Sequence, residues 1–369
     1  MRVQCAQEQL LREVQTVSRA ISSRASMPIL GNILLDASNH QLKVTATDLE
    51  LGIESQISAD VTEPGSITLP ARIFGDIVSN LPPATVTVDV SEGDTKTRIN
   101  CESIKFEILG LPATDFPLIP VGDGEVVARI EAGLFRTMIR QTSFAVSTDE
   151  TRPFLTGVYL VLENGGGRLV ATDGGRLALR TAKLSGSTRG KIAAIVPSKT
   201  MGELVRALAG IEGEVTVASH ENQLIFTIAG MRFVSRLIAG QFPPYEKVIP
   251  AEFTQRIRVG TEQLLRAVRR ASITARDSAN VVRLSAAERT LTITSNTPEV
   301  GKAQEDIEVR AEGETVQVAF NAKFLLDALA NMDAPDVSFD LTGSLSPGVL
   351  RPVEHTDYLY VLAPVRVYG

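Results

Sequence analysis

The chain is poor in the residues that build metal sites and covalent crosslinks. Only two cysteines and three histidines occur among 369 residues. Cys5 and Cys101 belong to no CxxC motif and have no metal-like spacing to His40, His220 or His355. We therefore expect neither structural zinc nor any other metal or cofactor, and the free thiols fit a reducing compartment.

Long hydrophobic runs are missing as well. No stretch approaches the roughly 20 apolar residues of a membrane-spanning helix. The N-terminal segment MRVQCAQEQLLREV interrupts every short apolar run with charge, which excludes the apolar core of a signal peptide. The chain is 44% apolar and 22% charged and lacks low-complexity tracts, which is typical of a folded protein. We expect a cytoplasmic protein without a membrane partner.

One pattern occurs three times along the chain. Each third opens with an amphipathic stretch, and apolar residues at i, i+3, i+4 and i+7 predict a helix that buries one face. These stretches are EQLLREVQTVSRAIS from Glu8, LFRTMIRQTSFAVS from Leu134 and TEQLLRAVRRASITA from Thr261. A second predicted helix follows in each third, in LPARIFGDIVSNL from Leu69, VPSKTMGELVRAL from Val196 and FNAKFLLDALANM from Phe320.

Two landmarks fix the period of the repeat. Strand-like runs end at Asp48, Asp173 and Asn296, at spacings of 125 and 123 residues. The basic residues Arg72, Lys199 and Lys323, near the starts of the second helices, are spaced by 127 and 124 residues. Because proline disfavours helix, the segments DFPLIP and QFPPYEKVIP read as extended linkers. We place the domains at 1–125, 126–253 and 254–369.

Strand-like runs fill the space between the predicted helices. TVTVDV, GVYLVLE, EVTVASH, QLIFTIAG and TVQVAF are alternating or β-branched and are separated by glycine, asparagine and aspartate turns. The predicted fold class is therefore α+β, with three repeated domains that each place two helices on antiparallel sheet.

Charge is distributed unevenly over these elements. The net charge of −6 argues against a nucleic-acid partner. The predicted helical segments 7–24, 70–82, 131–147, 197–209, 260–276 and 321–331 nevertheless sum to +6, which leaves −12 on the remainder. Such a protein can offer DNA one positive surface. The alternative is that these cations only decorate solvent-facing helix sides.

The sequence resembles the bacterial DNA polymerase III beta subunit, the replicative sliding clamp, over essentially its whole length. The resemblance rests on SRASMPILGNILL, TATDLEL, TRPFLTGVYL, VATDGGRLAL, VPSKTMGEL, SRLIAGQFPPYEKVIP and YVLAPVR. It implies three clamp-fold domains per chain, with helices lining a ring and antiparallel sheets outside. It further implies a head-to-tail homodimer around duplex DNA that confers processivity and has no catalytic residues.

The resemblance also implies two sets of site residues. Sequence-independent contacts to double-stranded DNA are expected from Arg24, Arg72 and Lys199, and the helix pattern alone adds Arg136, Arg140, Arg206, Arg266, Arg269 and Lys323. A cleft between the second and third domains is expected to bind linear motifs of the replicative polymerase alpha subunit, the clamp loader complex, and repair and translesion polymerases. The matching positions are Leu155, Thr172, Gly174, Gly175, Arg176, Leu177, Pro243, Val248, Asn321, Phe324, Leu345, Val361, Leu362, Ala363, Pro364, Val365 and Arg366.

Three positions depart from the family pattern. Gly175 stands where a histidine is usual, Ala363 replaces a commonly larger residue, and Tyr368 and Gly369 extend the usual end. These departures affect the expected shape of the cleft. They also motivate an alternative function, a specialised clamp paralogue that resists an inhibitor of the usual cleft.

An enzyme is the other alternative. The segment LENGGGRLVATDGGR is rich in glycine, but it matches neither GxxxxGK[ST] nor a GxGxxG that opens a helix. A hairpin turn between two strands explains its glycines more simply. Asp48 and Asp173 recur at repeat positions, yet the third copy has Asn296, so a shared catalytic carboxylate is not expected.

Overall fold

The computed structural model describes residues 1–22, 27–91, 93–117, 119, 124–184, 186, 188–275 and 280–366. Within these ranges each predicted helix forms, so the helix predictions are confirmed. The α-helices are α1 (Gln7–Val17), α2 (Ala71–Ser79), α3 (Ala132–Ser143), α4 (Ser198–Ala207), α5 (Thr261–Ala275) and α6 (Ala322–Ala330). No helix among the described residues is long and apolar enough to span a membrane.

Two helices end earlier than their apolar periodicity predicts. The α-helix α1 stops at Val17 and passes into a 3₁₀ turn over Ser18–Ala20, where the Ser18 hydroxyl donates to the Val14 carbonyl at 2.6 Å. The helix α3 stops at Ser143, and the N–H of Ser147 then donates to the carbonyl of Leu155 at 2.8 Å. Each helix therefore passes into a turn where the sequence pattern alone predicts further helix.

The chain divides into two compact units, which are described separately. Unit 1 comprises Met1–Gly133, Ser185–Arg189 and Glu203–Leu237, and unit 2 comprises Leu134–Leu184, Gly190–Gly202 and Ile238–Gly369. Each unit holds two sheets whose paired strands are antiparallel. Residues of the second predicted domain contribute to both units, so the boundaries near 125 and 253 stay predictions.

Unit 1 contains a five-stranded and an eight-stranded sheet. The first has the order β5 (Asp60–Glu63), β1 (Arg2–Ala6), β7 (Thr85–Val90), β8 (Lys96–Cys101), β9 (Ile104–Leu109). The second has the order β10 (Glu125–Glu131), β15 (Glu214–His220), β16 (Gln223–Ile228), β17 (Met231–Arg236), β4 (Leu51–Ser58), β3 (Gln41–Thr47), β2 (Asn32–Ser38), β6 (Gly65–Pro70).

Unit 2 contains a nine-stranded and a four-stranded sheet. The first has the order β14 (Ile192–Pro197), β11 (Gly157–Glu163), β12 (Gly166–Thr172), β13 (Arg176–Lys183), β26 (Tyr358–Leu362), β25 (Gly348–Pro352), β24 (Asp336–Leu341), β18 (Gln255–Gly260), β22 (Arg310–Gly313). The second has the order β21 (Gly301–Glu308), β20 (Thr290–Thr297), β19 (Val281–Ala287), β23 (Gln317–Asn321).

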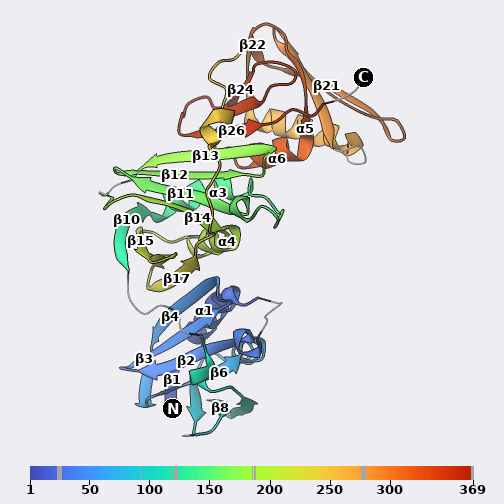
Figure 1. Cartoon of the computed structure of the whole chain (residues 1–369). Coiled ribbons are helices and arrows are strands. Elements are labelled where there is room, and N and C mark those ends of the chain that lie inside the picture. Colours follow the sequence, from blue (N-terminus) through green and yellow to red (C-terminus); the bar gives the residue numbers. More distant parts are fainter. Residues whose placement is uncertain are drawn as a thin grey trace. The chain divides into compact units, whose positions relative to one another are not determined.

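The helices pack one face against these sheets. In unit 1, α1 lies against α2, β3 and β4, and in unit 2, α5 lies against α6 and β18 to β21 (Figure 1). Leu10, Val14 and Val17 of α1 are buried at the spacing that the sequence predicted, as are Leu264 and Val268 of α5. The α+β fold class is thereby confirmed at the level of individual side chains.

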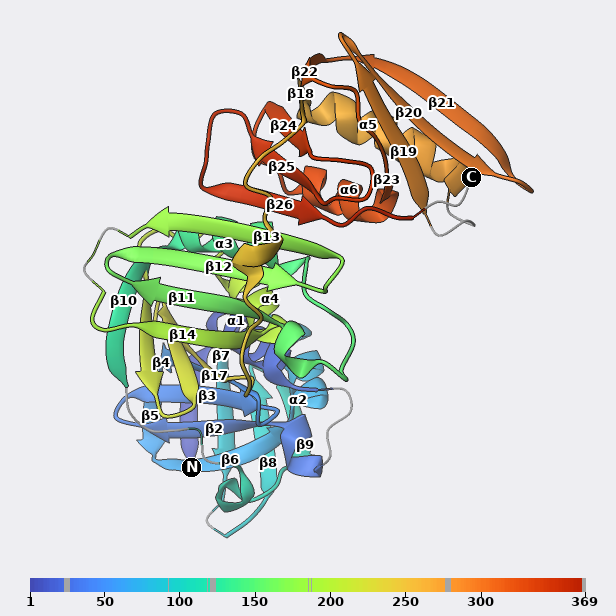
Figure 2. The same ribbon diagram turned by 45° about the horizontal axis from the view of Figure 1, so that its top comes forward.

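The junction of β13 and β26 positions the candidate site. Figure 2 shows β14, β11, β12 and β13 side by side, with β26 continuing the same sheet. Arg176 pairs with Leu362 and Leu177 with Val361 across this junction. Residues about 185 positions apart in the chain are thus held by one ladder of main-chain hydrogen bonds.

Candidate functional site

A cavity of about 390 Å³ opens in unit 2 where the β12–β13 turn, the segment 243–248 and the end of β26 meet. Its lining residues are Arg152, Phe154, Leu155, Thr172, Gly174, Gly175, Arg176, Leu177, Pro243, Pro244, Tyr245, Val248, Pro347, Val361 and Ala363. Most of this lining is apolar, and Leu155, Leu177 and Val361 belong to the buried core cluster beneath it. A concave apolar cavity with a few polar groups at its rim is typical of a ligand or peptide site.

The structure brings ten of the predicted cleft residues to this cavity. They are Leu155, Thr172, Gly174, Gly175, Arg176, Leu177, Pro243, Val248, Val361 and Ala363. The sequence reasoning missed Arg152, Phe154, Pro244, Tyr245 and Pro347 as lining residues. The first four lie in the segments TRPFLTGVYL and QFPPYEKVIP, so proximity in sequence to predicted residues was the available signal.

The remaining predicted cleft residues lie elsewhere in unit 2. Leu345 and Val365 line a second cavity of about 330 Å³ together with Arg283 and the β23 residues Gln317, Val318 and Ala319. Leu362 is fully buried, Pro364 is half-buried and Arg366 is exposed. Asn321 caps α6, because its side-chain oxygen accepts from the N–H of Lys323 at 2.9 Å. Phe324 lies against Arg176.

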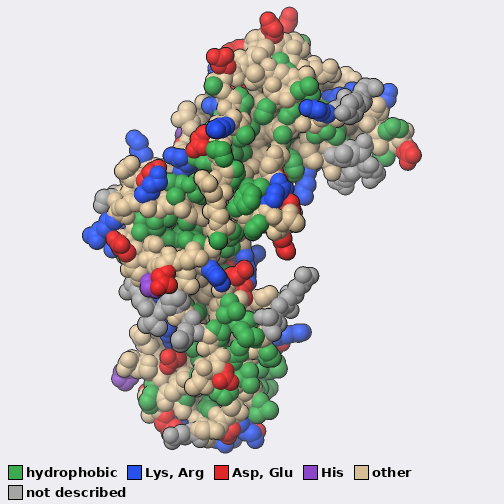
Figure 3. Space-filling view, viewed as in Figure 1, with side chains coloured by type: hydrophobic (Ala, Val, Ile, Leu, Met, Phe, Trp, Pro, Cys, Tyr) green, Lys and Arg blue, Asp and Glu red, His purple; other side chains and the backbone are tan. Residues whose placement is uncertain are grey.

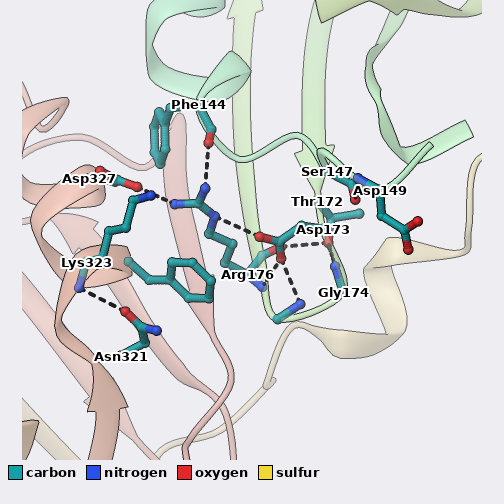
Figure 4. A network of polar contacts seen from close by, with 12 residues as sticks. Phe144, Ser147, Asp149, Thr172, Asp173, Gly174, Arg176, Asn321, Lys323 and Asp327 are labelled. Atoms are coloured by element: carbon teal, nitrogen blue, oxygen red, sulfur yellow. Dashed lines mark hydrogen bonds and ion pairs between the residues drawn. The ribbon is translucent and has the colours of Figure 1, made fainter. Parts of the chain in front are cut away.

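The turn that joins β12 to β13 forms the rim of the cavity, and the Asp173 carboxylate organises it. Asp173 Oδ1 accepts from the N–H of Gly175 at 2.8 Å and of Arg176 at 3.0 Å. The Thr172 hydroxyl oxygen accepts from the N–H of Gly174 at 3.1 Å. Gly174 has φ +94°, a conformation that side chains other than glycine rarely adopt. These short-range hydrogen bonds, shown in Figure 4, fix the rim.

Arg176 lies in the cavity wall, but its guanidinium donates to the protein (Figure 4). Nε donates to Asp173 Oδ2 at 3.0 Å, Nη1 to Asp327 Oδ2 at 2.6 Å and Nη2 to the Phe144 carbonyl at 2.8 Å. The guanidinium also lies over the Phe324 ring, 4.3 Å from its centroid. A guanidinium held in this way contributes packing and order to the wall more than a free positive charge.

The burial and partners of Arg176 have opposite effects on its pKa. Burial disfavours the charged form, whereas the hydrogen bond to Asp327 and the neighbouring Asp173 and Tyr360 favour it, and the net result is a raised pKa. The Tyr360 phenol is buried, which raises its pKa and keeps it neutral, and it donates to the Phe324 carbonyl at 3.1 Å. Arg176 therefore stays charged and Tyr360 stays neutral over the physiological pH range.

Gly175 and Ala363 shape the opening of the cavity. The N–H of Ala363 donates to the carbonyl of Gly175 at 2.9 Å, which ties the segment after β26 to the rim. A Cβ atom added to Gly175 would lie 3.5 Å from Asp173 Oδ1 and 3.5 Å from Phe324 Cε2, which is ordinary van der Waals contact. The surroundings of Gly175 therefore accommodate a Cβ atom, and the lack of a side chain leaves space beside Phe324.

The predicted DNA-contacting residues lie on helices or just before them. Arg72, Arg136, Arg206, Arg266, Arg269 and Lys323 are exposed, and Lys199 and Arg140 are half-buried. Arg24 lies outside the described residues, as do Tyr368 and Gly369. On the face visible in Figure 3, Lys and Arg side chains are interspersed with Asp and Glu rather than gathered in one patch.

Several of these basic side chains already pair with carboxylates. Arg140 bonds Asp333, Arg206 bonds Glu203, and Arg266 bonds Glu262. In contrast, the side chains of Arg72, Arg269 and Lys323 form no ion pair with any part of the chain that the structure describes. The latter three are therefore the stronger candidates for phosphate contacts.

The described residues offer no arrangement for catalysis by a metal or a reactive thiol. No group of three or more His, Cys, Asp or Glu side chains among them is placed to hold a metal ion. Cys5 and Cys101 are both buried, and burial raises the pKa of the Cys5 thiol to about 12, which disfavours the nucleophilic thiolate.

Family models match the chain in three successive parts. The N-terminal domain of the DNA polymerase III beta subunit matches residues 1–120, the central domain 129–244 and the C-terminal domain 246–366. The chain belongs to the DNA polymerase III beta subunit family. The predicted family and function are thereby confirmed: the protein is a sliding clamp, a non-catalytic processivity factor of DNA replication.

Individual relatives agree over full length. The chain is 36% identical over 379 residues to the beta sliding clamp of Bacillus subtilis, and the alignment covers all of both chains. The crystal structure of the Bacillus subtilis DNA polymerase sliding clamp matches with a TM-score of 0.97 over all of both chains. The DNA polymerase III subunit beta of Pseudomonas aeruginosa matches with a TM-score of 0.94 at 32% identity, again over all of both. No observation favours the alternative of a specialised paralogue.

Proposed function

We propose that two copies of this chain close head to tail into a ring around duplex DNA in the cytoplasm. The cavity of unit 2 would receive linear motifs of the replicative polymerase alpha subunit, the clamp loader complex, and repair and translesion polymerases. We retain domain boundaries near 125 and 253 as part of this proposal. One observation supports the ring: among the described residues, each unit has an edge strand with one side free of strand pairing and with exposed apolar side chains beside it.

The edge strands proposed to pair are β9 in unit 1 and β21 in unit 2, two of the eight strands at which the four described sheets end. Beside them, Leu109 is 67% exposed and Ile273 of α5, which packs against β21, is 60% exposed. Exposed strand edges invite pairing with another chain unless they are covered. A contact between two different surfaces of identical chains is heterologous, and it generates a ring when the rotation closes.

Charge supports pairing of these two edges. The edge strand β9 is neutral and the adjacent β8 carries +2, whereas β21 carries −2. Opposite charges on two surfaces steer association and disfavour pairing of like edges. A β9 edge is therefore expected to prefer a β21 edge over a second β9 edge.

Phosphate contacts through helix cations would suit a protein that slides. The candidate contacts Arg72, Arg269 and Lys323 are exposed, and arginine and lysine bind phosphates without reading base sequence. Such contacts weaken steeply with salt, so they do not by themselves explain retention on DNA. Retention at high salt would have to come from the closed ring.

The decisive experiment separates topological from electrostatic retention. The protein is loaded on a nicked circle with its clamp loader and ATP, washed in high salt, and the circle is then linearised. Retention on the circle followed by loss from the line supports the ring, whereas loss from both at high salt contradicts it. Ile273→Asp should abolish retention by opening the ring, and Val353→Asp, at an exposed apolar position outside both edges, is the matched control.

A further inference from the structure

Asp327 of α6 contacts the cleft without being part of its lining. The cavity wall contains Arg176, and Asp327 receives the Nη1 hydrogen bond of that arginine at 2.6 Å. The Asp327 side chain is 32% exposed, whereas the Arg176 side chain is only 9% exposed. We infer that Asp327 is a positioning residue, which sets the binding shape of the cleft by holding Arg176. This inference rests on the proposed role of the cavity as a peptide-binding cleft.

The two carboxylates around Arg176 have different roles. Asp173 lies three residues before Arg176 in the same turn and accepts its N–H as well as its Nε, so this contact is local. Asp327 lies 151 residues away and is the carboxylate that ties the guanidinium to α6 among the described residues. Phe324, one turn earlier on α6, supplies the ring on which the guanidinium lies.

The geometry of the network predicts what the loss of Asp327 does. A nearly buried cation that loses one of two carboxylates is poorly compensated, because little water reaches it. Arg176 is then expected to leave the Phe324 ring and turn toward the solvent-filled cavity. The cavity wall would gain a mobile positive charge in place of a fixed, neutralised one. Peptides that place an apolar side chain there should bind less tightly. Peptides that place an acidic side chain there should lose less affinity, because the freed cation attracts them.

Asp333 offers a matched control in the same region of the chain. It pairs with Arg140 of α3, so Asp333→Asn also removes one arginine–aspartate pair between segments far apart in sequence. Neither Arg140 nor Asp333 lines the cavity. The Arg140–Asp333 pair is more exposed, at 31% and 51%, so Asp333→Asn controls for removing a pair between distant segments away from the cavity, and an effect on peptide binding should appear only at Asp327.

The experiment measures the Kd of a fluorescent peptide by titration with the full-length protein. The peptide copies the clamp-binding segment of the replicative polymerase from the same cell. Asp327→Asn should raise Kd about tenfold, because the charged acceptor of the Arg176 guanidinium becomes a neutral amide oxygen and the charge-assisted hydrogen bond is weakened. Asp327→Glu should recover part of the affinity, and Asp333→Asn should change Kd less than about twofold. A second peptide, in which an acidic residue replaces one apolar residue of the first, should lose less affinity in Asp327→Asn than the first peptide does.

Amide hydrogen exchange over residues 173–177 supplies a readout that needs no peptide. Faster exchange there in Asp327→Asn, with unchanged exchange in Asp333→Asn, is the expected result. Equal peptide affinity of the unaltered protein and Asp327→Asn would overturn this inference alone. Absence of peptide binding by the unaltered protein would overturn the proposed function and this role with it. An equal loss of peptide affinity in Asp327→Asn and Asp333→Asn would contradict the positioning role and show that Asp327 acts only through overall stability.

Discussion

The turn at Asp48 in unit 1 and the turn at Asp173 in unit 2 share one backbone design. In each, the aspartate N–H donates to the carbonyl three residues later, at 3.2 Å for Asp48 and 3.4 Å for Asp173. Each Oδ1 accepts from the N–H groups two and three residues later, and each preceding threonine hydroxyl accepts from the residue after the aspartate.

The side chains on the two turns differ completely. Leu49, Glu50 and Leu51 occupy the positions of Gly174, Gly175 and Arg176. Leu51 is buried as a core residue, whereas Arg176 reaches two carboxylates and forms part of a cavity wall. The recurring aspartate is therefore a structural feature of the turn. The candidate site arises from the residues carried on that turn in one copy.

The largest effect on stability and peptide binding is expected when Arg176 of the second turn is replaced by leucine, the residue at the equivalent position 51 of the first turn. Arg176→Leu leaves the partly buried carboxylates of Asp173 and Asp327 without their shared cation, which should cost about 3 kcal/mol because both lose a hydrogen bond from a charged group. Denaturant unfolding should show this loss, and peptide titration should show no binding. Arg266→Leu, which removes an exposed arginine that pairs with the exposed Glu262, should change stability by less than about 0.5 kcal/mol.

A smaller effect is expected from removing the aspartate of either turn. Asp48→Ala and Asp173→Ala each remove the acceptor of two backbone N–H groups, at a cost of about 1–3 kcal/mol. Only Asp173→Ala should also weaken peptide binding. Comparable loss of peptide affinity in both variants would mean that the turn at Asp173 has no special connection to the cleft.

A still smaller effect on stability is expected from the residue that has positive φ in each turn. Gly174 has φ +94° and Leu49 has φ +78°. Gly174→Ala should therefore destabilise the protein by about 1 kcal/mol, and Leu49→Gly should be neutral or stabilising. Thermal unfolding of both single variants checks the sign. Destabilisation by Leu49→Gly would indicate that contacts of the leucine side chain outweigh its strained conformation.

The smallest effect on stability is expected at Gly175. Gly175→Glu introduces the residue of the first turn at a position with ordinary clearance, so stability should change by less than about 0.5 kcal/mol. The new side chain would fill the space beside Phe324 and should lower affinity for peptides with a bulky residue there. Unchanged affinity for such peptides would show that the opening at Gly175 is not used.

The third copy of the repeat marks a limit of sequence comparison. The period placed Asn296 at the position of Asp48 and Asp173. In the structure, Asn296 lies within β20 and pairs with Lys302 of β21, so it is not a turn residue. The spacing of similar residues identified equivalent places in the chain. It did not establish that the local hydrogen bonding was the same.

Amphipathic periodicity and β-branched runs determined the helices, the antiparallel strands and the α+β class, because burial of one face leaves a regular trace in sequence. The resemblance supplied most of the cavity residues, although nothing in a linear pattern distinguishes Leu155 or Leu177 from ordinary core. Only tertiary structure decided that the second repeat contributes to two compact units. It also decided that Arg140 and Arg176 are engaged by Asp333 and Asp327, since such pairs join residues far apart in the chain and leave no spacing that a sequence can show.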